Sequence, residues 1–104
     1  MIKYKVTLLQ AARDDIGEIF IYIGADNPES ALEISEKIIE KIDLLAEFPY
    51  AGKIVPDSAL AKQEYRMLIV SNYIVFYKVI DNEVIVYRIL HGMRDCPSLF
   101  NGPL

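Results

Sequence analysis

Residues 65–92 read YRMLIVSNYIVFYKVIDNEVIVYRILHG, and this stretch decides the fold. It contains three runs rich in β-branched and aromatic residues, which are typical of strands. Two short polar breaks, Ser71-Asn72 and Asp81-Asn82, separate the runs and suit tight hairpin turns. The stretch therefore predicts a three-stranded antiparallel meander. The expected strands are Tyr65–Val70, Tyr73–Ile80 and Val84–Leu90.

The last of these strands is expected near the centre of the sheet. Residues 84–87 are apolar at every position, as in a strand covered on both faces. A further strand is predicted at Ile2–Leu9, where polar and apolar residues begin by alternating with the period of a half-buried strand. It is the expected neighbour on the free side of the last strand. Residues 53–61 are expected to form a loop.

Two amphipathic helices are predicted between the first strand and the meander. From Gln10 to about Ala25 apolar residues recur at three- and four-residue steps. Asn27 is placed to cap a second helix that begins with Pro28, and Pro49 ends that helix shortly after Leu45. Two short-linked helices with facing apolar stripes form an antiparallel hairpin. The sequence thus predicts an α+β fold of order β-α-α-β-β-β, with an antiparallel sheet of about four strands packed against the helical hairpin.

The composition predicts one folded domain. The chain has 104 residues, of which 53% are hydrophobic and 25% charged, and only one cysteine. We expect the domain to span residues 1–95 and to be followed by a C-terminal tail, 96–104, whose Pro97, Gly102 and Pro103 oppose regular structure and favour mobility. Neither an export signal nor an apolar run of membrane-spanning length is visible, so a cytoplasmic protein without a membrane partner is expected.

The charge of the chain argues against binding nucleic acid through bulk positive charge. The formal net charge is −4. Residues 1–50 carry ten acids and five bases, whereas residues 51–104 carry five acids and six bases. Either the two halves form faces with different roles, or the solvated helices simply favour glutamate.

Several motifs in a fixed order resemble the ParE/RelE superfamily, the toxins of bacterial type II toxin-antitoxin (plasmid stabilisation) systems. The resemblance covers residues 2–95, and the ending at residues 88–95 is its most specific part and favours the ParE branch. It implies a β-α-α-β-β-β fold and a cognate antitoxin that neutralises the toxin. It also implies one of two targets, DNA gyrase for ParE-like members or messenger RNA in the ribosomal A site for RelE-like members. The motifs are Ala12-Arg13-Asp14-Asp15-Ile16 with Ile19 and Tyr22, Leu45 with Phe48-Pro49 and Gly52, Arg66, Leu68, Tyr73 and Tyr77, and Arg88-Ile89-Leu90-His91-Gly92-Met93-Arg94-Asp95.

The two targets place different demands on the residues. Metal-independent RNA cleavage needs a general base, a general acid and cations around the phosphate. Cations are sparse here, and Phe100 stands where RelE-like tails carry a tyrosine hydroxyl. We therefore expect a non-enzymatic inhibitor of DNA gyrase. The alternative is a ribosome-dependent endoribonuclease that uses His91, Arg66 and Arg94, and a further alternative is a non-toxic family member that only binds other proteins.

The residues expected to bind the target or the antitoxin are Arg66, Tyr73, Tyr77, Arg88, His91 and Arg94. Each also has a purely structural reading. The arginines can pair with nearby acids such as Asp95, the tyrosines can pack in the core, and the histidine can bond to a turn. The widened stripe of the second helix, with Leu32 and Ile39, either receives an antitoxin helix or a second copy of the chain, or is covered by the sheet. Neither a metal nor a cofactor is expected.

Overall fold

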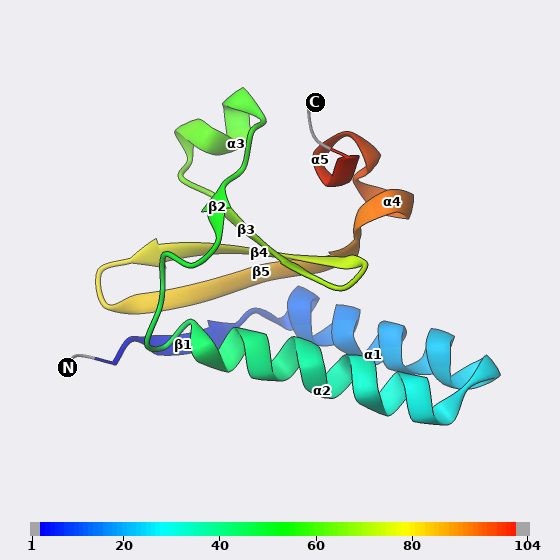
Figure 1. Cartoon of the computed structure of the whole chain (residues 1–104). Coiled ribbons are helices and arrows are strands. Elements are labelled where there is room, and N and C mark those ends of the chain that lie inside the picture. The colour runs from blue at the N-terminus through cyan, green and yellow to red at the C-terminus, as the bar shows by residue number, and fades with distance from the viewer. Residues whose placement is uncertain (1–2, 102–104) are drawn as a thin grey trace.

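The computed structural model describes residues 3–101 and has the predicted α+β class. Two long helices lie against one face of a five-stranded sheet, and short helices lie over the other face (Figure 1). Among the described residues, no helix has the length and apolar character needed to cross a membrane. The elements are β1 (Lys5–Leu8), α1 (Gln10–Asp26), α2 (Pro28–Leu44), β2 (Lys53–Ile54), α3 (Ser58–Lys62), β3 (Arg66–Val70), β4 (Tyr73–Ile80), β5 (Glu83–His91), α4 (Gly92–Asp95) and α5 (Pro97–Asn101).

The helical hairpin forms as predicted, with its boundary at Asn27. The Asn27 side chain accepts a hydrogen bond of 3.1 Å from the backbone amide of Ser30, and Pro28 occupies the first turn of α2, where a missing amide hydrogen costs nothing. Near the turn the helices approach closely, since a Cβ added at Gly24 would lie 3.5 Å from the Cβ of Ala31. The inner face of the hairpin packs on the sheet and forms the larger core cluster.

The sheet differs from the prediction in two respects. Its order is β1-β5-β4-β3-β2, and β1 runs parallel to β5, so the sheet is mixed and not antiparallel throughout. A parallel neighbour requires a long crossover, which the segment from α1 to β4 provides. The expected loop at residues 53–61 is also wrong in part, because it contains the two-residue β2 and the beginning of α3, which Asp57 caps through a 3.0 Å bond from the Leu60 amide.

The meander itself is confirmed, with one irregularity. A two-residue turn sets Val70 opposite Tyr73, and a second turn sets Ile80 opposite Glu83. The register between β4 and β5 shifts at Phe76/Tyr77, where β5 has one extra residue. Such a bulge reverses the face of the sheet to which the following side chains point. It therefore determines which face each side chain at the end of β5 occupies.

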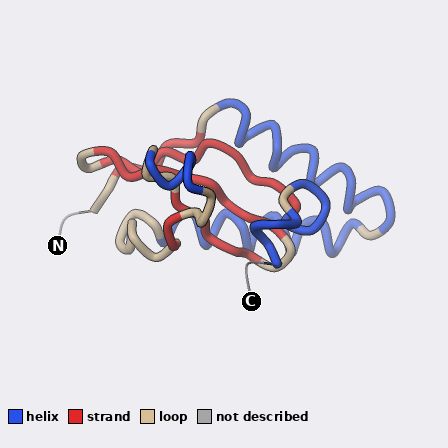
Figure 2. The backbone as a smooth tube through the Cα atoms, turned by 90° about the horizontal axis from the view of Figure 1, so that it is seen from above, coloured by secondary structure: helices blue, strands red, loops and turns tan. Residues whose placement is uncertain are grey.

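The second face of the sheet carries a smaller core cluster, beneath the short helices that Figure 2 shows lying over the strands. Val55, Met67, Ile74 and Phe76 are its buried members, and Leu99 of α5 packs against them. Residues 97–101 of the expected tail form α5, because Pro97 is compatible with the first turn of a helix, and the mobility expected for the tail stays a prediction. The Phe100 side chain and residues 102–104 lie outside the described part of the chain.

Candidate functional site

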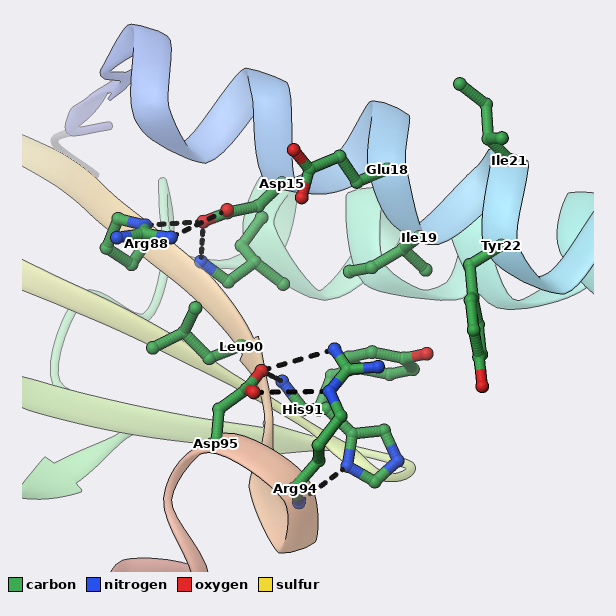
Figure 3. Close-up of a pocket in the computed structure, with 12 residues that line it drawn as sticks. Asp15, Glu18, Ile19, Ile21, Tyr22, Arg88, Leu90, His91, Arg94 and Asp95 are labelled. Carbon is green, nitrogen blue, oxygen red and sulfur yellow. Dashed lines mark hydrogen bonds and ion pairs between the residues drawn. The ribbon is translucent and has the colours of Figure 1, made fainter.

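A cleft lies where α1, the end of β5 and α4 meet, and we call it the β5 cleft (Figure 3). Its volume is about 550 Å³, and its walls are both polar and apolar. It brings together four of the six residues expected to bind a partner. The lining residues are Asp15, Glu18, Ile19, Ile21, Tyr22, Tyr73, Arg88, Ile89, Leu90, His91, Arg94 and Asp95.

Asp15 ties α1 to β5 at the inner end of the cleft. Its side chain is only 8% exposed and accepts two hydrogen bonds from the Arg88 guanidinium, of 2.8 and 3.0 Å. It also accepts a 2.9 Å bond from the Ile89 amide. β1 ends at Leu8, opposite Val86, so β5 has no neighbouring strand on this side beyond that point. There the Asp15 carboxylate accepts the backbone hydrogen bond that a neighbouring strand would otherwise accept. Arg88 is therefore held in an internal ion pair, and the Asp15 hydrogen bond raises its pKa above the ordinary value.

A second aspartate–arginine pair closes the outer end of the cleft. Asp95 accepts two bonds of 3.2 Å from Arg94 and one of 3.1 Å from the His91 amide, and the Arg94 bond is the main cause that lowers the pKa of Asp95. His91 Nδ1 caps α4 by accepting a 3.1 Å bond from the Arg94 amide. The His91 ring also meets Tyr73 edge to face, at 5.3 Å between ring centroids. Nδ1 is thus an acceptor occupied by the backbone.

The charges of the cleft do not make it a cationic surface. Asp15, Glu18 and Asp95 face Arg88 and Arg94, so the wall carries a net charge of −1 with His91 neutral. Both arginines are paired with one of these acids. A site built for phosphate would instead present unpaired cations.

Arg66 and Tyr77, the other two expected residues, lie outside the cleft, at what we call the Gly52 corner. Tyr77 is fully buried and its hydroxyl accepts a 2.8 Å bond from the Gly52 amide. Arg66 donates a 2.7 Å bond to the Gly52 carbonyl, and its guanidinium lies 4.7 Å from the centroid of the Tyr50 ring. Burial raises the pKa of Tyr77. Both side chains therefore fasten the segment after α2 to the sheet.

Tyr73 and Tyr77 share one face of the sheet, as their spacing predicted, and both contribute to the core under the helical hairpin. Tyr73 is 6% exposed and reaches the floor of the β5 cleft. Burial is also the main cause that raises its pKa. Tyr73 therefore contributes an aromatic ring to the cleft, and the surrounding core holds that ring in place.

Asp15, Glu18 and Tyr22 line the cleft but were not among the expected binding residues. Asp15 has a recognisable signal, because it lies three residues after Ala12 and four before Ile19 and so belongs to the buried stripe of α1. Glu18 and Tyr22 lie on the exposed side of the same helix, one turn apart. Their helical positions gave no indication of which strand would face them.

A second cavity of about 440 Å³ lies on the other face of the sheet and is almost wholly apolar. Cys96 is among its lining residues, and burial raises the pKa of this thiol, which disfavours the reactive thiolate. Within residues 3–101, no three His, Cys, Asp or Glu side chains gather in a way that could hold a metal ion. The cavity is lined by Leu9, Ala11, Leu60, Tyr65, Phe76, Tyr87, Arg88, Leu90, Cys96 and Leu99.

Comparison with known proteins agrees with this architecture. The fold is similar to a structure of the chromosomal ParDE toxin-antitoxin system from P. aeruginosa, with a TM-score of 0.73 and 19% identity over 88% of this chain and 98% of that one. It is also similar to a chain of the toxin-antitoxin complex RelBE2 from Mycobacterium tuberculosis, with a TM-score of 0.60 and 20% identity over 86% of this chain and 99% of that one. No curated protein sequence gives a significant match.

The sequence also matches a family directly. Residues 6–96 fit the family described as the ParE toxin of the type II toxin-antitoxin system parDE. The match runs from β1 through α4 and so includes both walls of the β5 cleft. The chain therefore belongs to the ParE toxin family of type II toxin-antitoxin systems.

Proposed function

We propose that this chain inhibits DNA gyrase by binding it, without catalysing a reaction, and that a cognate antitoxin neutralises it by covering the β5 cleft. Membership of the ParE family supports the toxin role, and the structural neighbours are toxin-antitoxin systems. In this proposal Tyr73, Arg88, His91 and Arg94 form the contact surface. Arg66 and Tyr77 hold the fold.

The pairing of the arginines is the observation that carries this proposal. Cleavage of RNA without metal needs cations that are free to meet the charge developing on the phosphate. Arg88 and Arg94 each donate two hydrogen bonds to an aspartate, and the cleft as a whole is net negative. Such a surface favours contact with another protein over phosphate chemistry.

The test measures both activities with the same purified chain. We expect inhibition of negative supercoiling by purified DNA gyrase and no cleavage of messenger RNA on translating ribosomes. Addition of the cognate antitoxin should restore supercoiling. Cleavage of the transcript without any effect on gyrase would overturn the proposal. An effect on neither target, together with harmless expression in cells, would indicate a non-toxic binding protein.

A ribosome-dependent endoribonuclease is the second candidate, and His91 is the observation that favours it. Only Nδ1 of this imidazole is engaged by the backbone, and the ring lies beside Arg94 in the same cleft. An imidazole in this position can act as a general acid or base toward a bound substrate. If this candidate is right, His91→Asn, which keeps a side-chain acceptor for the Arg94 amide, should abolish transcript cleavage while circular dichroism shows that the fold persists.

A further inference from the structure

The β5 cleft has one acid that forms neither an ion pair nor a side-chain hydrogen bond within the described residues. This acid is Glu18, whereas Asp15 and Asp95 are each bound by an arginine. Glu18 extends from α1, one turn after Asp15, and lines the cleft (Figure 3). The net charge of −1 thus resides on an exposed carboxylate that is available to a ligand.

The walls near Glu18 suit a cation attached to an apolar stem. Ile21 and Tyr22 are 72% and 70% exposed, which is unusual for large apolar side chains. The guanidinium of Arg94 lies 5.7 Å from the centroid of the Tyr22 ring, so this ring already attracts a cation of the chain itself. A long basic side chain combines an aliphatic stem with a charged end and matches both features.

An anionic ligand fits the same cleft poorly. The guanidinium of Arg88 is held by the buried carboxylate of Asp15, which also binds the Ile89 amide. An anion in the cleft would meet arginines whose charge Asp15 and Asp95 already offset, and it would also lie close to the unpaired negative charge of Glu18. Charge complementarity therefore selects a positively charged group.

We propose that the β5 cleft receives one lysine or arginine side chain of the antitoxin, whose charged end pairs with Glu18 while its stem packs against Tyr22 and Ile21. This inference rests on the proposed function for the existence of the antitoxin and adds the chemistry by which it is recognised. The occupant contributes charge-assisted hydrogen bonds to Glu18. The two internal aspartate–arginine pairs stay in place and shape the walls.

A double-mutant cycle with the cognate antitoxin tests the proposal. Glu18→Gln preserves size and removes the charge, and we expect it to weaken antitoxin binding roughly tenfold, mainly through faster dissociation. Glu36→Gln removes one charge from the exposed face of α2, outside the cleft, and is the matched control. Each lysine and arginine of the antitoxin is then replaced by alanine, and its binding is measured against the wild-type chain and both variants.

The expected result is one basic antitoxin residue whose replacement weakens binding to the wild-type chain and to Glu36→Gln, but has little further effect on Glu18→Gln. The proposal is overturned if every replacement has the same effect on all three toxins, or if an acidic antitoxin residue couples with Arg94 instead. Failure of the wild-type chain to bind the antitoxin would contradict the proposed function itself. Circular dichroism of Glu18→Gln establishes that its fold is unchanged.

Discussion

The Gly52 corner and the β5 cleft each place an arginine at an end of the sheet, but with different surroundings. At the corner, Arg66 and the buried Tyr77 both bond to the backbone of Gly52. At the cleft, Arg94 pairs with its own neighbour Asp95, and their side chains are 56% and 34% exposed. The comparison teaches that residue type and position on a strand do not decide whether an arginine is structural. What decides is whether its partner is buried.

Burial also predicts how much each region contributes to stability. A buried hydrogen bond cannot be replaced by water when one partner is removed, whereas an exposed ion pair exchanges its partner for solvent at little cost. The corner should therefore be sensitive to small changes that leave function intact. Substitutions in the outer cleft should change the free energy of unfolding only slightly and should weaken partner binding instead.

Gly52→Ala should cause the largest loss in the free energy of unfolding. A small loss would contradict the difference drawn between the corner and the cleft. The added Cβ would lie 2.7 Å from the Met67 carbonyl oxygen and 2.7 Å from the Tyr77 hydroxyl, so backbone must move and the Tyr77 bond must break. We expect a loss of about 3 kcal/mol or more in the free energy of unfolding. Urea unfolding followed by circular dichroism measures it.

Gly17→Ala is the matched control for this substitution. Apart from its chain neighbours and the backbone of its own helix, no atom lies within 4 Å of the position of a Cβ at Gly17, which sits on the exposed side of α1. Alanine favours a helix interior, so this variant should gain about 0.5–1 kcal/mol. Equal unfolding midpoints for the two variants would contradict the role assigned to the corner.

Asp15→Ala should cause the next largest loss of stability. Asp15 is buried and bonds to backbone, like the partners at the corner, whereas the pair of Arg94 and Asp95 is exposed. The change leaves the Ile89 amide without its partner and Arg88 without its counter-charge. We expect a loss of about 2 kcal/mol in the free energy of unfolding, given that Arg88 itself is half exposed. Asp14→Ala, at an exposed position whose side chain bonds only to Gln10, should change it by less than about 0.5 kcal/mol. If Asp15→Ala and Asp14→Ala lost similar amounts of stability, Asp15 would contribute no more than an ordinary surface acid.

Tyr77→Phe sharpens the same contrast with the removal of one oxygen. The ring keeps its packing, but the Gly52 amide loses its acceptor in a buried position. The expected cost is about 1 kcal/mol, and thermal unfolding measures it. Tyr50→Phe is the control, since Tyr50 is exposed and contacts Arg66 through its ring and not its hydroxyl. A Tyr77→Phe chain as stable as the control would show that the hydroxyl adds nothing.

The strand pairing beside the corner follows from the sequence more directly than the cleft does, because it depends on a short-range turn, although the contacts of Arg66 and Tyr77 with Gly52 were not expected. A two-residue turn at Ser71-Asn72 pairs Val70 with Tyr73, and counting outward places Arg66 opposite Tyr77. The cleft depends instead on the bulge at Phe76/Tyr77, which aims Ile89 and Arg88 toward an α1 residue more than 70 positions away.

The elements show the same division. Helical periodicity and a clear cap defined α1 and α2, and the strand pattern defined the meander. The parallel pairing of β1 escaped prediction because period-two alternation is identical in parallel and antiparallel strands. The short β2 and α3 escaped it because two and five residues are too few to establish a period.

Asp95→Asn should have the smallest effect, and its dependence on pH identifies the cause. Arg94 holds the pKa of the Asp95 carboxyl below the ordinary value of 3.8. Because the folded chain releases this proton more readily than the unfolded chain, ionised Asp95 contributes stability above the unfolded pKa, and the contribution is lost as pH falls through the lower, folded pKa. Wild type should therefore exceed Asp95→Asn by less than about 0.5 kcal/mol at pH 7, and the two should converge in acid. Urea unfolding at a series of pH values measures the difference, and in an Arg94→Ala background the difference and its dependence on pH should shrink. A difference that instead grows as the pH falls, or that is unaffected by loss of Arg94, would mean that Asp95 acts mainly through its bond to the His91 amide, and the outer cleft would then resemble the buried corner.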